Sequence, residues 1–192
     1  MRPSVVILSA IALLFGGSPP PLEPHFRAAS PRGWVVEGKQ EGRIEWMRFS
    51  QSTEMDGEDY AGSAITLYRV EVDRRPEEAG EALTGEKLDK QGVRTRSPVD
   101  RSVKGIRWRG FEADYASESG APRRESYLYV ARGKKTLYLF WARGPSDRFR
   151  AASPLVETSL QKVSEAISGD EPEPEGFVPE VPHGARADAE ME

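Results

Sequence analysis

The stretch ESYLYVARGKKTLYLFWAR, residues 125–143, decides the fold of this chain. It predicts two strands, residues 126–131 and 135–142, joined by a turn over residues 132–134 in which Gly133 supplies a positive φ. The return strand carries apolar side chains on both faces, namely Leu137, Leu139 and Trp141 on one and Tyr138 and Phe140 on the other. Such a strand must be covered on both faces, so we expect it in the middle of a sheet with packing above and below.

Alternating or apolar segments and two helical segments surround this hairpin. The expected strands are residues 34–36, 43–49, 64–72, 93–97 and 103–117, and the expected helices are residues 75–91 and 145–168. In the long strand 103–117, the apolar positions change phase across Gly110, which predicts a β-bulge there. Pro154 lies inside the last helical segment and predicts either a kink or the start of a second helix.

The domain organisation follows from composition. Residues 1–18 combine Arg2 with an apolar run and small residues, as in an export signal, and the alternative is an uncleaved membrane anchor. Residues 19–32 are expected to form a Pro-rich linker and residues 33–168 one α+β domain. Residues 169–192 hold eight acids, one base and four prolines, which predicts a disordered acidic tail of charge −7. The whole chain carries −4, so the remainder carries about +3.

The expected domain, residues 33–168, lacks the side chains of the commonest neutral-pH catalysts. The chain contains no cysteine, and its two histidines, His25 and His183, fall in the expected linker and tail. Ser-His-Asp catalysis and zinc sites built on His or Cys are therefore not expected in the domain. No phosphate-binding loop or dinucleotide fingerprint is present, and we predict no cofactor and no metal.

The order of elements resembles the PsbP/Mog1-type α/β/α sandwich, an antiparallel sheet covered by helices on both faces. The resemblance spans about residues 33–168 and rests on four segments: Gly33-Trp34, the strand from Val103 to Tyr115, the hairpin from Tyr127 to Trp141, and the helix end Ala166-Ile167-Ser168. That superfamily includes photosystem II extrinsic subunits, a Ran-GTPase binder and exported bacterial proteins. The resemblance implies a binding or assembly role without catalysis, and no family site matches residues of this chain.

The candidate partner-binding residues lie in the basic segment 90–109. They are Arg94, Arg96, Lys104, Arg107 and Arg109. Such a cluster is typical of a surface that meets phosphate, an anionic envelope polymer or an acidic protein, although cations also keep exposed strand edges from pairing. The acidic tail of the same chain is a further candidate occupant. The acidic loop 54–59 could hold calcium, but its spacing matches no established loop and a solvated turn explains it as well.

These observations favour a non-catalytic, exported binding or assembly module of the cell envelope. Its expected partner is a protein or an anionic envelope component, without nucleic acid, and the chain is expected to be monomeric. The protein would be periplasmic or extracellular. It would associate with the membrane only if residues 1–18 were not cleaved and acted as an anchor. The alternative is a carboxylate-dependent hydrolase acting on an envelope component, with the general acid and base drawn from pairs such as Glu112 and Asp114.

Overall fold

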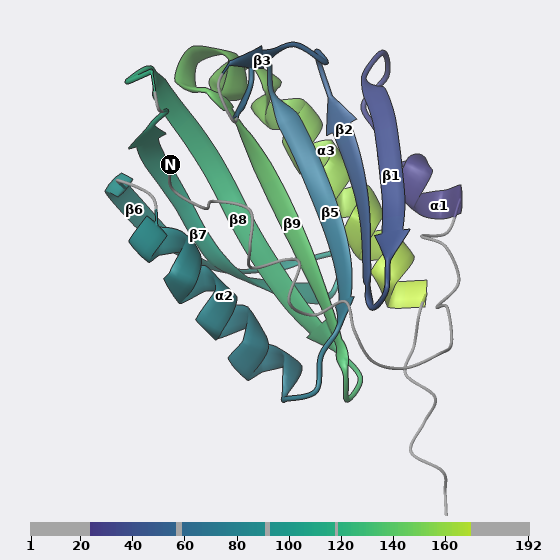
Figure 1. Cartoon of the computed structure of the whole chain (residues 1–192). Helices are drawn as coiled ribbons and strands as arrows, with labels where there is room; N and C mark the ends of the chain where they lie inside the picture. Colours follow the sequence, from purple (N-terminus) through teal and green to yellow (C-terminus); the bar gives the residue numbers. More distant parts are fainter. Residues whose placement is uncertain (1–23, 57–58, 91–92, 118, 170–192) are drawn as a thin grey trace, which may run out of the picture.

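The protein is a seven-stranded antiparallel sheet between two helices (Figure 1). The computed structural model describes residues 24–56, 59–90, 93–117 and 119–169; the expected export signal, the first part of the linker and the acidic tail lie outside them. The strand order is β1-β2-β5-β9-β8-β7-β6. These strands are β1 (Val35–Glu41), β2 (Ile44–Ser50), β5 (Ala64–Glu71), β6 (Val93–Val103), β7 (Ile106–Ala116), β8 (Pro122–Arg132) and β9 (Thr136–Pro145). The helices are α1 (Pro24–Arg27), α2 (Pro76–Lys90) and α3 (Ser146–Gly169), and the short pair β3 (Met55–Asp56) and β4 (Asp59–Tyr60) lies in the acidic loop.

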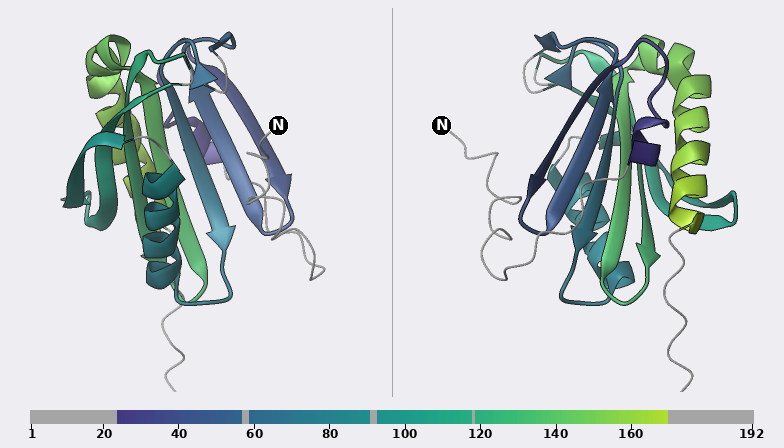
Figure 2. Two further views of the ribbon diagram at one scale, coloured as in Figure 1. Left: turned by 60° about the vertical axis from the view of Figure 1, so that its left-hand side comes forward. Right: turned by 90° about the vertical axis from the view of Figure 1, so that its right-hand side faces the viewer.

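The central position predicted for the return strand is confirmed. β9 pairs with β5 on one side and with β8 on the other, and Gly133 has a φ of 61° in the turn between β8 and β9. Leu137 and Leu139 are buried towards α2, whereas Tyr138 and Phe140 are buried towards α3. The edge-on views in Figure 2 show the two helices on opposite faces, so the expected α+β sandwich with an antiparallel sheet is confirmed.

The two faces bury unequal cores. The larger core lies under α3 and contains Met47, Phe49, Ile65, Leu67, Trp108, Leu128, Phe140, Leu160, Val163 and Ile167, among others. The smaller core lies under α2, which packs on β7, β8 and β9. Gly80 brings α2 close to this face, because a Cβ added there would lie 2.3 Å from the Tyr129 ring.

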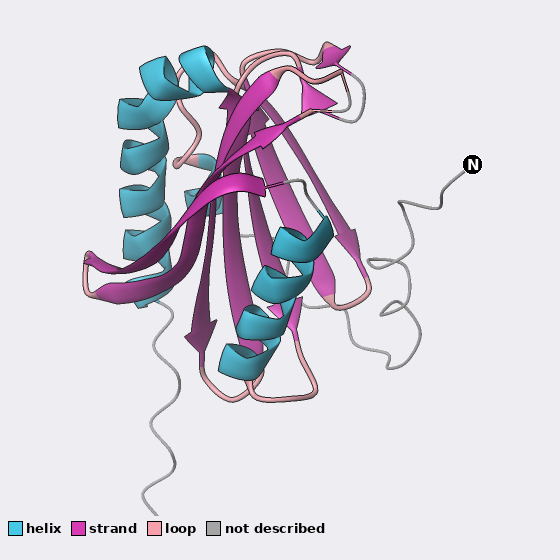
Figure 3. Ribbon diagram, turned by 90° about the vertical axis from the view of Figure 1, so that its left-hand side faces the viewer, coloured by secondary structure: helices cyan, strands magenta, loops and turns pink. Residues whose placement is uncertain are grey.

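The last helix is continuous through Pro154. α3 runs from Ser146 to Gly169 with this proline inside it, and its ribbon changes direction near its start (Figure 3). A proline cannot donate an amide hydrogen bond, so a bend in one helix was one of the two outcomes expected. The helix therefore stays on one face of the sheet and reaches from one end of it to the other.

The folded part of the chain begins earlier than residue 33. Phe26 and Ala29, inside the expected linker 19–32, are buried, and Phe26 lies beside Tyr138. Ser159 donates a hydrogen bond to the Ala29 carbonyl at 2.7 Å, which ties this segment to α3. The sequence did not predict this contact, because a short Pro-rich segment contains too few apolar residues to show a helical or strand periodicity. Among the described residues, no helix is both long and apolar enough to cross a bilayer.

The bulge predicted at Gly110 is wrong. The pairing of β7 with β8 is continuous across this residue, and so is its pairing with β6, whose register instead shifts between Val93 and Thr95. Ile106 and Trp108 belong to the core under α3, whereas Phe111 and Ala113 belong to the core under α2. The apolar residues switch from even to odd positions because α3 covers one part of this regular strand and α2 covers the other part, on the opposite face.

Candidate anion-binding pocket

The sheet splits at one end, between β7 and β8. The ladder between these strands runs from the pair Ala116–Pro122 to the pair Arg109–Tyr129 and stops there. Beyond it, β7 continues with β6 alone and β8 with β9 alone. A pocket of about 300 Å³ lies at this fork. Its lining residues are Glu77, Gly105, Ile106, Arg107, Arg109, Val130, Ala131 and Arg132.

A two-residue turn makes the β6–β7 end a hairpin. Lys104 and Gly105 have φ values of 51° and 80°, and Val103 pairs directly with Ile106. Positive φ at both central residues is the geometry of the type I′ hairpin turn. The strand expected over residues 103–117 therefore begins at Ile106, because Val103 belongs to the preceding strand.

Trp108 ties the hairpin to α3 next to the fork. Its side chain is fully buried, and its indole Nε1 donates to Ser164 Oγ at 2.9 Å. Gly110, next to the last paired residue of β7, has a φ of 146°, and a Cβ there would lie 2.0 Å from the Tyr127 carbonyl oxygen. Glycine therefore permits the close strand contact from which β7 diverges.

Two ion pairs connect the same hairpin to α3. Arg101 Nη2 lies 3.0 Å from Glu157 Oε2, and Lys104 Nζ lies 2.9 Å from Glu165 Oε1. Partly exposed pairs of this kind contribute about 0–1 kcal/mol each. Their main effect is to fix where the hairpin end sits relative to the end of α3.

Three arginines are among the residues that line the pocket, and each guanidinium is held in a different way. Arg107 makes two hydrogen bonds of 2.8 Å to Asp100, and this hydrogen bonding lowers the pKa of the Asp100 carboxyl. Arg109 donates to the Tyr129 hydroxyl, whose pKa is raised chiefly by burial. Arg132 Nη2 donates to the Ile167 carbonyl at 3.2 Å.

The pocket therefore has an excess of positive charge. Its carboxylates are Glu77, which is exposed, and Asp100, which Arg107 already engages. Among the described residues, neither Arg109 nor Arg132 forms an ion pair with a carboxylate, and Arg132 Nε is a buried donor without a hydrogen-bond partner. A guanidinium group that has no carboxylate partner is suited to bind a phosphate or carboxylate group through paired N–H donors.

The structure brings two of the five predicted binding residues together. Arg107 and Arg109 line the pocket, whereas Lys104 lies at the turn and pairs with Glu165. Arg96 is exposed opposite Ala113, four ladder positions from the residue opposite Arg109. Arg94 lies on β6, and its side chain is outside the described set. Whether these five residues bind a partner stays a prediction.

Sequence reasoning missed Arg132 and Glu77 as pocket residues. Arg132 falls in the turn predicted over residues 132–134, and Glu77 falls in the first turn of the helix predicted over residues 75–91. The sequence signal that could have found Arg132 was the predicted turn over residues 132–134. A turn between two strands lies at the end of a sheet, where the turn of a second hairpin can lie beside it. Only the two-residue turn at Lys104 and Gly105 makes that second hairpin visible.

The carboxylates considered for hydrolysis are engaged in one ion-pair cluster. Arg124 Nη2 lies 3.1 Å from Glu112 Oε2, and Arg124 Nη1 lies 3.7 Å from Asp114 Oδ1. Both carboxylates therefore share one guanidinium of β8. Among the described residues, no group of three metal-binding side chains lies together; part of the acidic loop 54–59 falls outside them.

A second polar cluster lies on the α2 face and anchors that helix. Trp141, expected in the core, is half-buried between Lys87 Nζ and the Arg143 guanidinium, at 3.9 and 4.0 Å from the ring centroid. Its Nε1 donates at 2.7 Å to Glu125, a carboxylate with 0% exposure that also pairs with Lys87. Burial, and then the nearby Tyr68 and Glu125, raise the pKa of the Tyr127 hydroxyl. These contacts fix α2 on the sheet through Lys87.

Comparisons with known proteins give likenesses of structure only. No protein-family model matches the chain, and no curated protein matches it. Among solved structures, LpqN of Mycobacterium tuberculosis, described as involved in cell envelope biogenesis, is 15% identical with a TM-score of 0.48 over 71% of this chain and 78% of that chain. PA94 of Pseudomonas aeruginosa, a protein of unknown function and putative regulator, is 12% identical with a TM-score of 0.40 over 67% and 94%. Human STARD10 is 11% identical with a TM-score of 0.29 over 79% and 84%. Similarity at this level carries no activity or ligand over to this chain.

Proposed function

We propose that this protein is a non-catalytic, exported binding or assembly module of the cell envelope. It holds an anionic group of a protein or an envelope component in the fork pocket between β7 and β8. The observation that carries the proposal is that Arg107, Arg109 and Arg132 all line one pocket of about 300 Å³. The envelope location is supported by the apolar run after Arg2.

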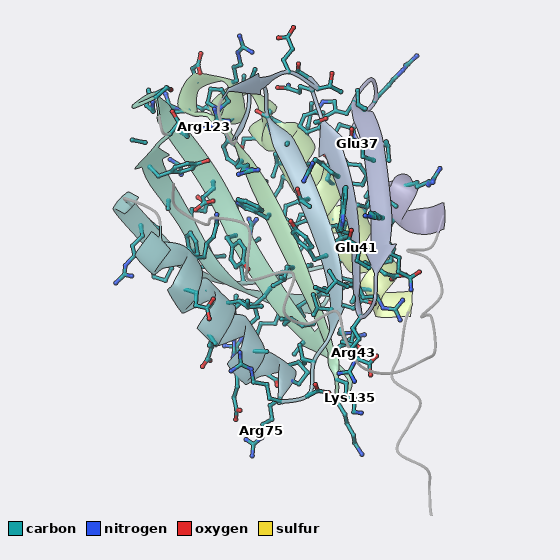
Figure 4. All side chains as sticks on the ribbon, viewed as in Figure 1. Glu37, Glu41, Arg43, Arg75, Arg123 and Lys135 are labelled. Atoms are coloured by element: carbon teal, nitrogen blue, oxygen red, sulfur yellow. The ribbon has the colours of Figure 1, made fainter. Side chains whose placement is uncertain are left out.

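A pocket lined by three arginines suits a compact anionic group better than a long polyanion. Figure 4 places Arg43, Arg75 and Lys135 near one end of the sheet and Arg123 near the other. Arg43 is also engaged with Asp73, and Arg75 with Glu78. Nucleic-acid binding relies on an extended basic stripe that follows many phosphates, and a pocket with three guanidiniums does not provide one.

Binding would use the pocket largely as it stands. Trp108 and the ion pairs to α3 fix the hairpin that carries Arg107 and Arg109, while the β8–β9 hairpin carries Arg132. An anion that accepts hydrogen bonds from these side chains would neutralise the excess positive charge. The pocket opens to solvent, so salt screens the attraction between the arginines and the anion. Binding should therefore weaken as the ionic strength rises above about 0.1 M, where the Debye length is about 10 Å.

The test is calorimetric titration of the full chain with inorganic pyrophosphate at low salt. A hydrogen bond to a charged group is worth about 1.5–3 kcal/mol, so R107Q/R109Q should weaken binding by at least about 10-fold. The matched control R148Q/R150Q removes two exposed arginines near the opposite end of α3 and should change the affinity by less than about 2-fold. Equal losses in both variants, or no binding by the unmodified chain and by a chain lacking residues 170–192, would contradict the proposal.

A further inference from the structure

We infer that the first occupant of the fork pocket is the acidic segment that follows α3 in this same chain, residues 170–175. This inference rests on the proposed function, since it names what an external anion must displace. The segment reads Asp-Glu-Pro-Glu-Pro-Glu and carries four carboxylates: Asp170, Glu171, Glu173 and Glu175. It would bind through its carboxylates, which are the anionic groups that arginines lining a pocket are suited to hold.

The end of α3 lies at the pocket. Arg132, a lining residue, donates to the carbonyl of Ile167, two residues before the helix ends at Gly169. Lys104 lies at the turn next to the lining residue Gly105. It pairs with Glu165, which is one helical turn before the helix ends at Gly169. The segment thus leaves the helix beside the cations that it would meet.

The distance is within reach of the segment. A chain spans at most about 3.3–3.6 Å per residue, so the six residues 170–175 can extend roughly 20 Å from Gly169. The pocket wall is nearer than that, because Arg132 touches the last turn of α3. Two prolines, Pro172 and Pro174, favour extended backbone and thereby lower the conformational entropy lost on binding.

The charges of α3 itself point the same way. The last turn of α3 contains no basic residue, although a helix C-terminus favours nearby cations. Arg132 and Lys104 reach this end from two hairpins instead. Tethering four carboxylates next to these cations gives a high effective concentration, so weak individual contacts suffice to compete with a free anion.

The chain offers a matched pair of variants to test this. The proximal variant D170N/E171Q/E173Q/E175Q and the distal variant E180Q/D188N/E190Q/E192Q each remove four negative charges from the same tail. We expect the proximal variant to bind inorganic pyrophosphate at least about 5-fold more tightly than the unmodified chain at low salt, and the distal variant to change it by less than about 2-fold. The gain should disappear in the R107Q/R109Q background. Equal gains in the two tail variants would show a general charge effect and would overturn the inference, as would no gain in either.

A second measurement separates this inference from the proposed function. In the absence of any added anion, the Nε–H signals of Arg109 and Arg132 in NMR spectra should differ between the unmodified chain and the proximal variant, but not between the unmodified chain and the distal variant. If these signals differ as expected and pyrophosphate binds no variant, the tail contact stands and the proposed function fails. If pyrophosphate binds the unmodified chain and both tail variants equally, is weakened by R107Q/R109Q, and the signals are unchanged, the proposed function stands and the tail contact is refuted.

Discussion

Two glycines of α2 give a sharp test of how this helix sits on the sheet. A Cβ at position 80 would lie 2.3, 2.5 and 2.8 Å from three carbons of the Tyr129 ring, whereas a Cβ at position 85 would meet nothing within 4 Å. Replacing glycine by alanine inside a helix stabilises it by up to about 1 kcal/mol. At position 85 this gain should appear in full. At position 80 it is opposed by overpacking, which costs about 1–3 kcal/mol.

The comparison of G80A with G85A isolates the packing term. Both changes act on the same helix and carry the same helix propensity, so their difference in unfolding free energy should be about 1–3 kcal/mol, with G80A the less stable. Urea unfolding followed by tryptophan fluorescence measures it. Tyr129 is 5% exposed and accepts a hydrogen bond from Arg109, so displacing its ring should also weaken pyrophosphate binding in G80A but not in G85A. If G80A were as stabilising as G85A, α2 would not rest on Tyr129 and the placement of Arg109 would be wrong.

Two further predictions concern the sheet. G110A should destabilise the protein by more than about 2 kcal/mol in urea unfolding, because its Cβ would overlap the Tyr127 carbonyl at a φ that favours glycine; a loss below about 0.5 kcal/mol would refute the strand contact at the fork. Burial raises the pKa of Glu45 despite its ion pair with Arg69, so the folded chain holds this proton more tightly than the unfolded chain does. The unfolding free energy of the unmodified chain should therefore fall, relative to that of E45Q, as pH rises from about 4 to 7. A constant or opposite difference would show that Glu45 is not held in the buried environment described.

The central hairpin was predictable because a strand that is apolar on both faces has one stable location. Leu139 and Phe140 face opposite layers, and no alternative pairing would bury both. The same rule failed at Gly110, since a change of covered face and a bulge produce the same pattern of apolar residues along one strand. Periodicity reports which side of a strand is apolar and does not report which helix lies over it.

The pocket was only half predictable, for a related reason. Arg107 and Arg109 stand out in a basic segment, but Arg132 lies 23 positions further along the chain and becomes their neighbour only through the fork. Likewise, Gly80 and Gly85 look equivalent in the sequence, and only the packing of α2 distinguishes them. Long-range contacts of this kind depend on strand register and helix placement, which local patterns do not contain.

The most direct test of the central claim is the response of individual arginines to a bound anion. The full chain, with ¹⁵N-labelled arginine, is titrated with inorganic pyrophosphate at low salt, and the Nε–H signal of each guanidinium is followed. The signals of Arg107, Arg109 and Arg132 should shift together and saturate as one site, while those of Arg148 and Arg150 stay in place. Shifts spread evenly over all these arginines, or no shift at the three pocket residues up to saturating pyrophosphate, would contradict that claim.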